Sequence, residues 1–192
     1  MPLETRTLSR KLEFRAADTG KTIAGYAAVF NSETDIGGYF REVIAPGAFR
    51  DSLSGDVRAL IDHNSGRVIG RTTAGTLRLS EDATGLACEI DLPETTDGLD
   101  LATLISRGDI SGMSFGFEVT KQTWDETGDI PVRTIEAVNL FEVSVVAFPA
   151  YPDTTIALRS LEAVRKARPA HPGHQRIAER KARTEQVARG IR

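Results

Sequence analysis

Short runs of alternating apolar and polar residues recur over the first half of the chain, and each run ends near Gly, Asp or Pro. Two runs, 8–16 and 22–30, flank the turn-like sequence DTGK and predict a β-hairpin. A polar loop is expected over 31–38. Further short strands are expected at 39–44, 57–62, 67–72, 75–82 and 85–92. This spacing predicts a mainly β, predominantly antiparallel architecture.

Two segments have helical character instead. A proline suits the first turn of a short helix over 46–53, and 95–106 has apolar residues at helical spacing. Thr96 or Asp97 is expected to cap the longer helix, and Gly108 to end it.

The second half contains two long predicted strands, 113–124 and 137–148, with a polar loop and a short strand, 132–137, between them. The run LFEVSVVAF at 140–148 is apolar on both faces, as in a central strand. Beyond Arg159 the composition changes to Ala, Arg, Lys and Glu with little apolar pattern. We therefore expect one domain over 1–159 and a helical or disordered basic tail over 160–192.

Charge follows the same division. The whole chain has a net charge of −3, but residues 159–192 carry ten Lys and Arg against three Asp and Glu, or +7. The remaining residues therefore carry −10, which disfavours specific nucleic-acid binding by the body. No run of about 18 apolar residues and no secretory leader is present, so we expect a soluble protein without a membrane span. Cys88, the only cysteine, excludes an internal disulfide and reads as a small buried hydrophobe.

Ser114 is a candidate nucleophile, because it stands between Gly112 and Gly116 in the sequence GMSFG. The sequence matches the G-x-S-x-G nucleophile elbow, but that elbow follows a strand and precedes a helix, whereas here the order is reversed. A serine hydroxyl needs a base within hydrogen-bond reach. His63 is the only histidine in the predicted body, and it follows a predicted strand in the sequence DHNSG. Its neighbours Asp62 and Asn64 have the simpler interpretation of turn formers.

Glu142 is the candidate third member, because it stands inside the apolar run at 140–148. An ionised carboxylate buried without a partner costs several kcal/mol, roughly, so it needs a partner such as an imidazole N–H. Pairing with an arginine such as Arg133 is an equally good interpretation. Ser144 shares the face of Glu142 and is a weaker candidate for a supporting hydrogen bond. The sequence contains no phosphate-binding loop, dinucleotide fingerprint or metal-ligand cluster, so we expect no cofactor.

Several separated blocks resemble one known family. They are GYAAVFN (25–31), EVIAPGAF (42–49), DHN (62–64), GRT and GTL (70–77), RGDISGMSFGF (107–117) and FEVSVVAFPAYPDT (141–154). Together, and in this order, they are similar to the tailed-phage prohead proteases, which cleave capsid and scaffold proteins during head maturation. The resemblance covers residues 10–159.

The resemblance implies a fold similar to the herpesvirus assembly protease, a closed or nearly closed antiparallel β-barrel with a few surrounding helices. It also implies a serine endopeptidase in which Ser114 is the nucleophile and His63 the base. Herpesvirus relatives use a second histidine as the third member, which this body lacks, so Glu142 is assigned to that role. Donors to the oxyanion are expected from backbone N–H groups near the glycines or from Arg71 or Arg133.

Family membership further implies the partners. The expected substrates are the major capsid protein, a separate scaffold protein or the protease itself, within the prohead in the host cytoplasm. A homodimer is a candidate assembly, since the herpesvirus relatives depend on dimerisation. Two alternatives are a non-enzymatic assembly factor that retains the barrel, and an unrelated soluble hydrolase.

Overall fold

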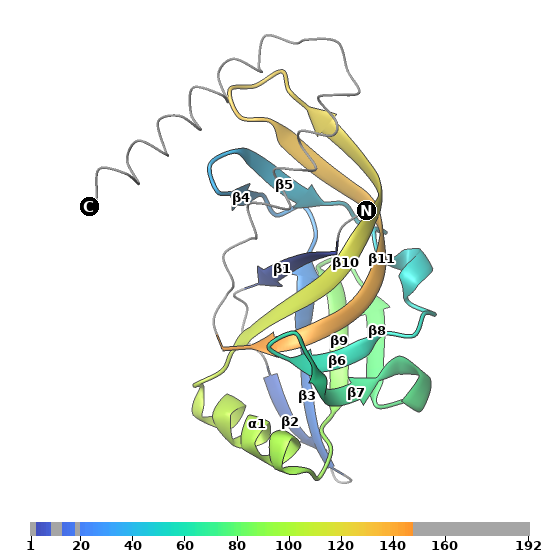
Figure 1. The fold of residues 1–192 in the computed structure, drawn as a ribbon, viewed down its shortest axis with the longest axis vertical. Helices are drawn as coiled ribbons and strands as arrows, with labels where there is room; N and C mark the ends of the chain where they lie inside the picture. The colour runs from blue at the N-terminus through green and yellow to red at the C-terminus, as the bar shows by residue number, and fades with distance from the viewer. Residues whose placement is uncertain (1–2, 9–12, 18–19, 148–192) are drawn as a thin grey trace, which may run out of the picture.

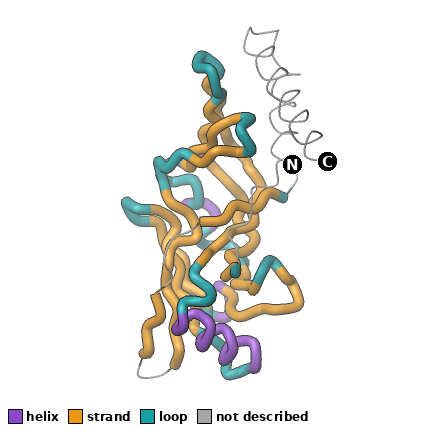
Figure 2. The backbone as a smooth tube through the Cα atoms, turned by 90° about the vertical axis from the view of Figure 1, so that its left-hand side faces the viewer, coloured by secondary structure: helices purple, strands orange, loops and turns teal. Residues whose placement is uncertain are grey.

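The computed structural model of the chain describes residues 3–8, 13–17 and 20–147, which form two β-sheets and a helix (Figure 2). The larger sheet has seven strands, and five of them lie in the order β1-β10-β11-β5-β4. Its strands are β1 (Glu4–Leu8), β4 (Thr34–Ile36), β5 (Phe40–Ile44), β6 (Arg58–Ile61), β7 (Asn64–Arg71), β10 (Gly112–Asp125) and β11 (Val132–Val146). The smaller sheet is antiparallel in the order β2-β3-β9-β8. Its strands are β2 (Glu13–Ala17), β3 (Gly20–Val29), β8 (Leu77–Glu81) and β9 (Gly85–Asp91).

The antiparallel pair β10 and β11 is the centre of the fold. Both strands are long and curved, and in Figure 1 they run through most of the described molecule. The second edge of β11 is shared, because residues 132–135 pair in parallel with β5 and residues 142–145 pair in parallel with β6. The hairpin β6-β7 is therefore attached to the C-terminal part of β11.

The structure does not show the closed or nearly closed antiparallel barrel that the resemblance implies. No hydrogen-bonded ladder joins the two sheets within the described residues, and both partners on the second edge of β11 are parallel to it. Alternation of side chains predicts where strands occur but contains no information about which strands pair. The coarser expectation of a mainly β fold with little helix is confirmed.

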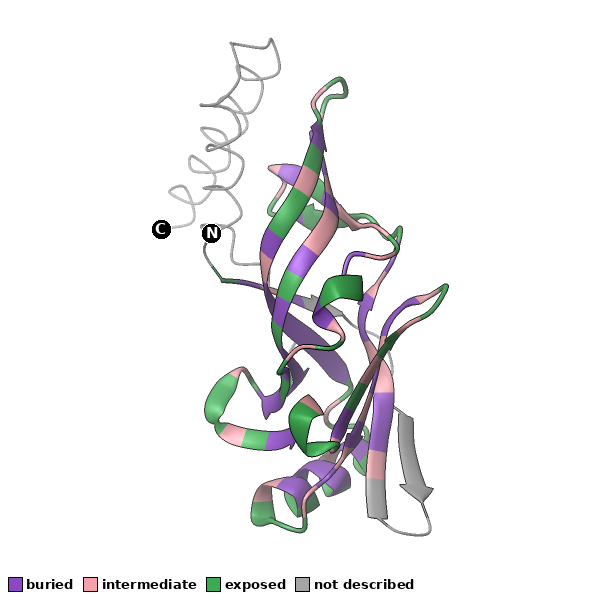
Figure 3. Cartoon of the chain, turned by 90° about the vertical axis from the view of Figure 1, so that its right-hand side faces the viewer, coloured by how far each residue is buried: buried purple, intermediate pink, exposed green. Residues whose placement is uncertain are grey.

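Four phenylalanines pack together within the main hydrophobic core, and Figure 3 shows buried segments along the strands of both sheets. The ring of Phe49 lies 6.3 Å from that of Phe30 and 5.4 Å from that of Phe115, which in turn stacks on Phe117 at 4.7 Å. Alternation along β10 directs Phe115 and Phe117 to one face and Ser114 to the other. Every residue from Gly112 to Phe117 is nevertheless buried, so both faces of this part of β10 are covered.

Helix α1 (Thr96–Arg107) agrees closely with its prediction. Thr95, one residue before the expected caps, is the N-cap, and its side chain accepts a hydrogen bond from the Gly98 N–H. Gly108 ends the helix as predicted, with a φ of 82° that favours glycine. No helix in the described part of the chain is long and apolar enough to span a membrane.

Three other local predictions differ from the structure. The helix expected at 46–53 is reduced to a 3-10 turn over Arg50–Ser52, and the predicted loop at 31–38 contains β4. The strands expected at 132–137 and 137–148 form the single strand β11. The predicted tail, 160–192, and the boundary before it lie outside the described residues.

Candidate active site

Ser114 lies on β10 between two neighbouring strands. Its Cα partner on β11 is Ser144, and its partner on β1 is Thr7. The side chain of Ser114 is completely buried. The candidate nucleophile is therefore fixed on a strand that has neighbours on both sides.

His63 is held in a tight turn that joins β6 to β7. The turn consists of Asp62 and His63, with φ angles of 49° and 57°. Positive φ at both central positions is typical of the type I′ hairpin turn, which strongly favours Asn-Gly, and each non-glycine residue there costs about 1 kcal/mol or more. Asp62 is thus a turn residue as predicted, whereas Asn64, also interpreted as a turn former, already belongs to β7. Such strain is common where a side chain must be aimed at a functional site.

Glu142 meets the imidazole of His63. The His63 Nδ1 and Glu142 Oε1 atoms are 2.6 Å apart. The second carboxylate oxygen accepts a hydrogen bond of 2.7 Å from the Ser144 hydroxyl, which itself accepts one of 3.1 Å from the His63 backbone N–H. The structure therefore places Glu142 against His63 and not against Arg133, and the supporting contact predicted for Ser144 is present.

The second ring nitrogen of His63, Nε2, is available to accept a proton. Within the described residues, His63 Nε2 is buried and has no hydrogen-bond partner. A carboxylate on Nδ1 holds the proton on that nitrogen and leaves Nε2 as the acceptor, which is the state a general base requires. Ser114 is the direct neighbour of Ser144 across the ladder, so Ser114 and Glu142 lie on adjoining strands, and His63 lies in the turn after β6, which pairs with β11.

Gly116 makes room for this carboxylate. It is the Cα partner of Glu142, and a Cβ added to it would lie 3.1 Å from Glu142 Cγ and Cδ and collide with Oε1. A glycine beside Ser114 permits close approach of a neighbouring group. At Gly116 the close approach is that of the Glu142 side chain.

Strand β1 covers the nucleophile. It pairs with the edge of β10 from Phe117 to Met113, and the Ser114 hydroxyl donates a hydrogen bond of 2.8 Å to the backbone carbonyl of Arg6. A peptide paired on this edge therefore places a carbonyl group against the candidate nucleophile. The sequence analysis did not predict β1, because its residues Glu-Thr-Arg-Thr-Leu have too little apolar character to indicate a strand.

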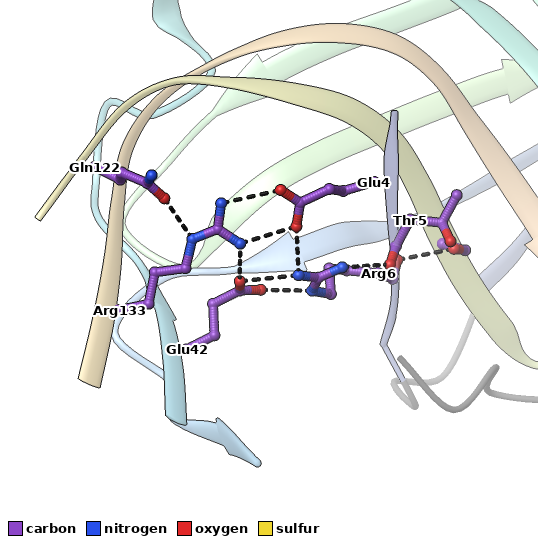
Figure 4. Close-up of polar contacts among 7 residues, drawn as sticks. Glu4, Thr5, Arg6, Glu42, Gln122 and Arg133 are labelled. Carbon is purple, nitrogen blue, oxygen red and sulfur yellow. Dashed lines mark hydrogen bonds and ion pairs between the residues drawn. The ribbon is translucent and has the colours of Figure 1, made fainter. Parts of the chain in front are cut away.

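A buried ring of four charges anchors β1 (Figure 4). Arg6 contacts Glu42 at 2.6 and 2.9 Å and Glu4 at 2.6 Å, while Arg133 contacts Glu4 at 2.8 and 2.9 Å and Glu42 at 2.9 Å. None of the four side chains is more than 7% exposed. Burial opposes the charge of Glu4, but the hydrogen bonds and charges of Arg133 and Arg6 outweigh it and hold the pKa of Glu4 below its usual value.

Neither arginine proposed for the oxyanion is placed as expected. Arg71 ends the eight-residue strand β7, at the opposite end from His63, and forms two hydrogen bonds with Asp56. Arg133 belongs to the charged ring. Cys88 is buried as predicted, and burial raises the pKa of its thiol to about 12. Among the described residues no group of three His, Cys, Asp or Glu could hold a metal ion.

Comparison with known proteins identifies the family. The family model described as the Caudovirus prohead serine protease matches residues 9–167. The chain belongs to this family. It is thus a prohead serine protease, a peptidase of capsid maturation.

Individual relatives support the assignment. The prohead protease of Enterobacteria phage HK97 is 32% identical over 179 residues, covering 88% of this chain and 75% of that protein. The prohead protease of Escherichia phage T5 is 33% identical over 99 residues, which cover 52% of this chain and 44% of that protein. The solved structure of the bacteriophage T4 capsid assembly protease matches with a TM-score of 0.54 at 13% identity, over 75% of this chain and 96% of that one. At that identity the T4 structure shows a shared fold.

Proposed function

We propose that Ser114, His63 and Glu142 are the catalytic triad of this prohead serine protease. The observation that carries the proposal is the 2.6 Å contact between His63 Nδ1 and Glu142 Oε1, with Nε2 buried and free of partners within the described residues. The neighbouring position of Ser114, opposite Ser144 in the ladder, supports the assignment of the nucleophile.

In the proposed mechanism Ser114 Oγ attacks the scissile carbonyl carbon, and His63 Nε2 accepts the hydroxyl proton. The C–N bond then breaks, and the same proton passes from Nε2 to the leaving amine. The acyl group of the substrate is then held as an ester on Ser114. Water, activated by His63 in the same way, hydrolyses this ester and restores the serine. Glu142 keeps the imidazole in the correct tautomer and stabilises the imidazolium that forms in each step.

The proposed substrates are the capsid and scaffold proteins of a tailed phage, cut inside the prohead. A substrate segment would lie extended on the edge of β10, because main-chain pairing with a sheet edge supplies affinity without a deep pocket. Strand β1 occupies that edge, so it has to leave before another segment can bind. The carbonyl of Arg6 beside Ser114 Oγ also makes the N-terminal segment a candidate for self-cleavage.

Co-expression with the major capsid protein of the same phage tests the proposal, with intact mass of the capsid protein as the readout. Wild type should truncate the capsid protein, and Ser114→Ala and His63→Ala should not. Ser52→Ala is a matched control, because Ser52 is also a buried, hydrogen-bonded serine but contacts Val138 and Leu140 instead. Full-length capsid protein with wild type, in particles that still assemble, would favour an assembly factor. Truncation by Ser114→Ala would exclude Ser114 as nucleophile.

A further inference from the structure

We propose that Glu42 and Arg133 determine cleavage specificity. In this account they select a substrate strand with a basic residue immediately before the cleaved bond and an acidic residue two positions earlier. The inference rests on the proposed function, since it names the substrate sequence that the same site accepts.

Glu42 and Arg133 form a pair that does not depend on β1. They are Cα partners in the parallel pairing of β5 with β11, and their side chains are 2.9 Å apart. Gln122 accepts a hydrogen bond of 2.6 Å from Arg133 Nε, and the guanidinium lies 5.8 Å from the Trp124 ring centroid. The pair therefore has contacts on β5, β10 and β11 in addition to those with β1.

The other hydrogen bonds of this pair are made with the edge strand β1. Glu42 accepts two hydrogen bonds from Arg6, and Arg133 donates two to Glu4 (Figure 4). When β1 leaves, one buried carboxylate and one buried guanidinium each lose two charge-assisted bonds. A strand with an acidic residue, any residue and a basic residue restores all four bonds, whereas a neutral strand leaves them unmade.

The register connects this charge pattern to the cleaved bond. Arg6 pairs with Phe115 on β10, and its carbonyl accepts the hydrogen bond from Ser114 Oγ. A substrate in the same register presents the carbonyl of its basic residue to the nucleophile. Ser114 Oγ then bonds to that carbonyl carbon, the C–N bond to the following residue breaks, and the leaving amine takes the serine proton through His63.

Alternation along the edge strand accounts for the two-residue spacing. Glu4 and Arg6 pair with Phe117 and Phe115, so their side chains share a face of the sheet while Thr5 points to the other face. The Arg6 guanidinium also lies 5.6 Å from the Phe117 ring centroid, which favours a cation at this position. The identity of the intervening residue is not read by the charged pair.

Competition between peptides tests the inference with the full-length chain. Four peptides are mixed with it: one with the sequence of residues 1–12, one with Glu4→Gln, one with Arg6→Gln, and one in which Glu4 and Arg6 are exchanged. Cleavage between positions 6 and 7 is followed by mass spectrometry, and Ser114→Ala gives the background. We expect the parent peptide to be cut about tenfold faster or more than each variant, because each variant forfeits charge-assisted hydrogen bonds. The exchanged peptide has the same composition, so it controls for net charge.

A variant of the enzyme adds a second test. Glu42→Gln should reduce the preference for arginine over glutamine at position 6, whereas Glu33→Gln, on the exposed Glu33 that pairs with Arg41, should keep it. Equal cleavage of all four peptides would overturn the inference and leave the protease intact. Cleavage of the capsid protein but of none of the peptides would do the same. Failure to cut either the peptides or the capsid protein would overturn the proposed function and the inference with it.

Discussion

His63 and Glu142 are 79 positions apart in the sequence, yet their side chains meet at 2.6 Å. The contact exists because β6 pairs in parallel with residues 142–145 of β11 and delivers its turn to that end of the strand. Ser144 then ties the carboxylate to the backbone of His63. The base and its acid are thus positioned by sheet pairing, with a strained two-residue turn as the only loop involved.

Glu142→Gln should reduce kcat for capsid or peptide cleavage by about a thousandfold or more, because an amide neither fixes the imidazole tautomer reliably nor stabilises the imidazolium. KM should change little, since Glu142 is proposed to act on His63 rather than on substrate. Steady-state kinetics with a cleavable peptide measures both constants. Ser144→Ala, which removes a supporting hydrogen bond, should lower kcat much less. A wild-type kcat in Glu142→Gln would show that Glu142 is not part of the mechanism.

Gly116→Ala should reduce activity with only a small loss of stability. The added methyl group overlaps the position of the Glu142 carboxylate, and that flexible side chain can move aside at the cost of its contact with His63. Activity and the thermal midpoint should be compared with those of Gly128→Ala, whose Cβ would make an ordinary contact 3.7 Å from the Ile130 carbonyl oxygen. Full activity in Gly116→Ala would contradict the role given to the glycine.

Glu4→Gln should lower the free energy of unfolding at neutral pH by up to about 3 kcal/mol, since it removes one partner from a buried charged ring. The loss is limited by the free energy of docking β1, because the strand can detach instead. Burial works against the charged form of Glu4, but Arg133 and Arg6 hold the pKa of Glu4 below its usual value of 4.5. Its contribution is therefore complete above that value and is lost as the pH falls through the lower folded-state value.

Denaturant titrations of wild type and Glu4→Gln at several pH values measure this effect. The difference between the two proteins should be constant above about pH 5 and should shrink as the pH falls below 4.5. Arg6 stays charged throughout this range, since a guanidinium titrates far above it. Burial opposes the charge of Arg6, but Glu42 and Glu4 outweigh it and raise the pKa of the guanidinium. A difference that grows on acidification would show that the ring does not stabilise the ionised carboxylate.

Deletion of residues 160–192 should reduce incorporation into proheads while sparing peptide cleavage by the purified protein. The basic sequence from residue 159 onward, with a balance of +7, is proposed to bind an acidic segment of the scaffold or capsid protein. Quantifying the protease in isolated proheads against the capsid protein tests this. Undiminished incorporation of the shortened chain would rule out a targeting role.

Local patterns in the sequence predicted the elements whose structure depends on local chemistry. Helix α1 and its glycine stop follow from apolar spacing and from the conformational freedom of Gly108. The two parallel pairings of β11 could not be predicted in the same way, since the alternation of apolar and polar residues does not indicate which strands pair. That is why the observed sheets differ from the predominantly antiparallel architecture that the sequence pattern predicts.

The candidate site could be predicted where a residue was unusual for its position in the sequence. A single body histidine and an acid inside an apolar strand pointed to His63 and Glu142. Glu4, Arg6 and Glu42 were missed, because each is an ordinary charged residue that becomes significant only when β1 and β5 bring it to Arg133. Glu42 does stand in the block EVIAPGAF that resembles the family, which was the one available signal.

The central claim, that His63 activates Ser114, is tested most directly by labelling with a fluorophosphonate and mapping the adduct by mass spectrometry. The protein should come from a preparation that truncates the capsid protein. The account predicts an adduct on Ser114 that is lost in His63→Ala and forms faster in Glu4→Gln, where β1 is released more easily. An adduct on another serine, with Ser114 unmodified in active protein, would contradict it.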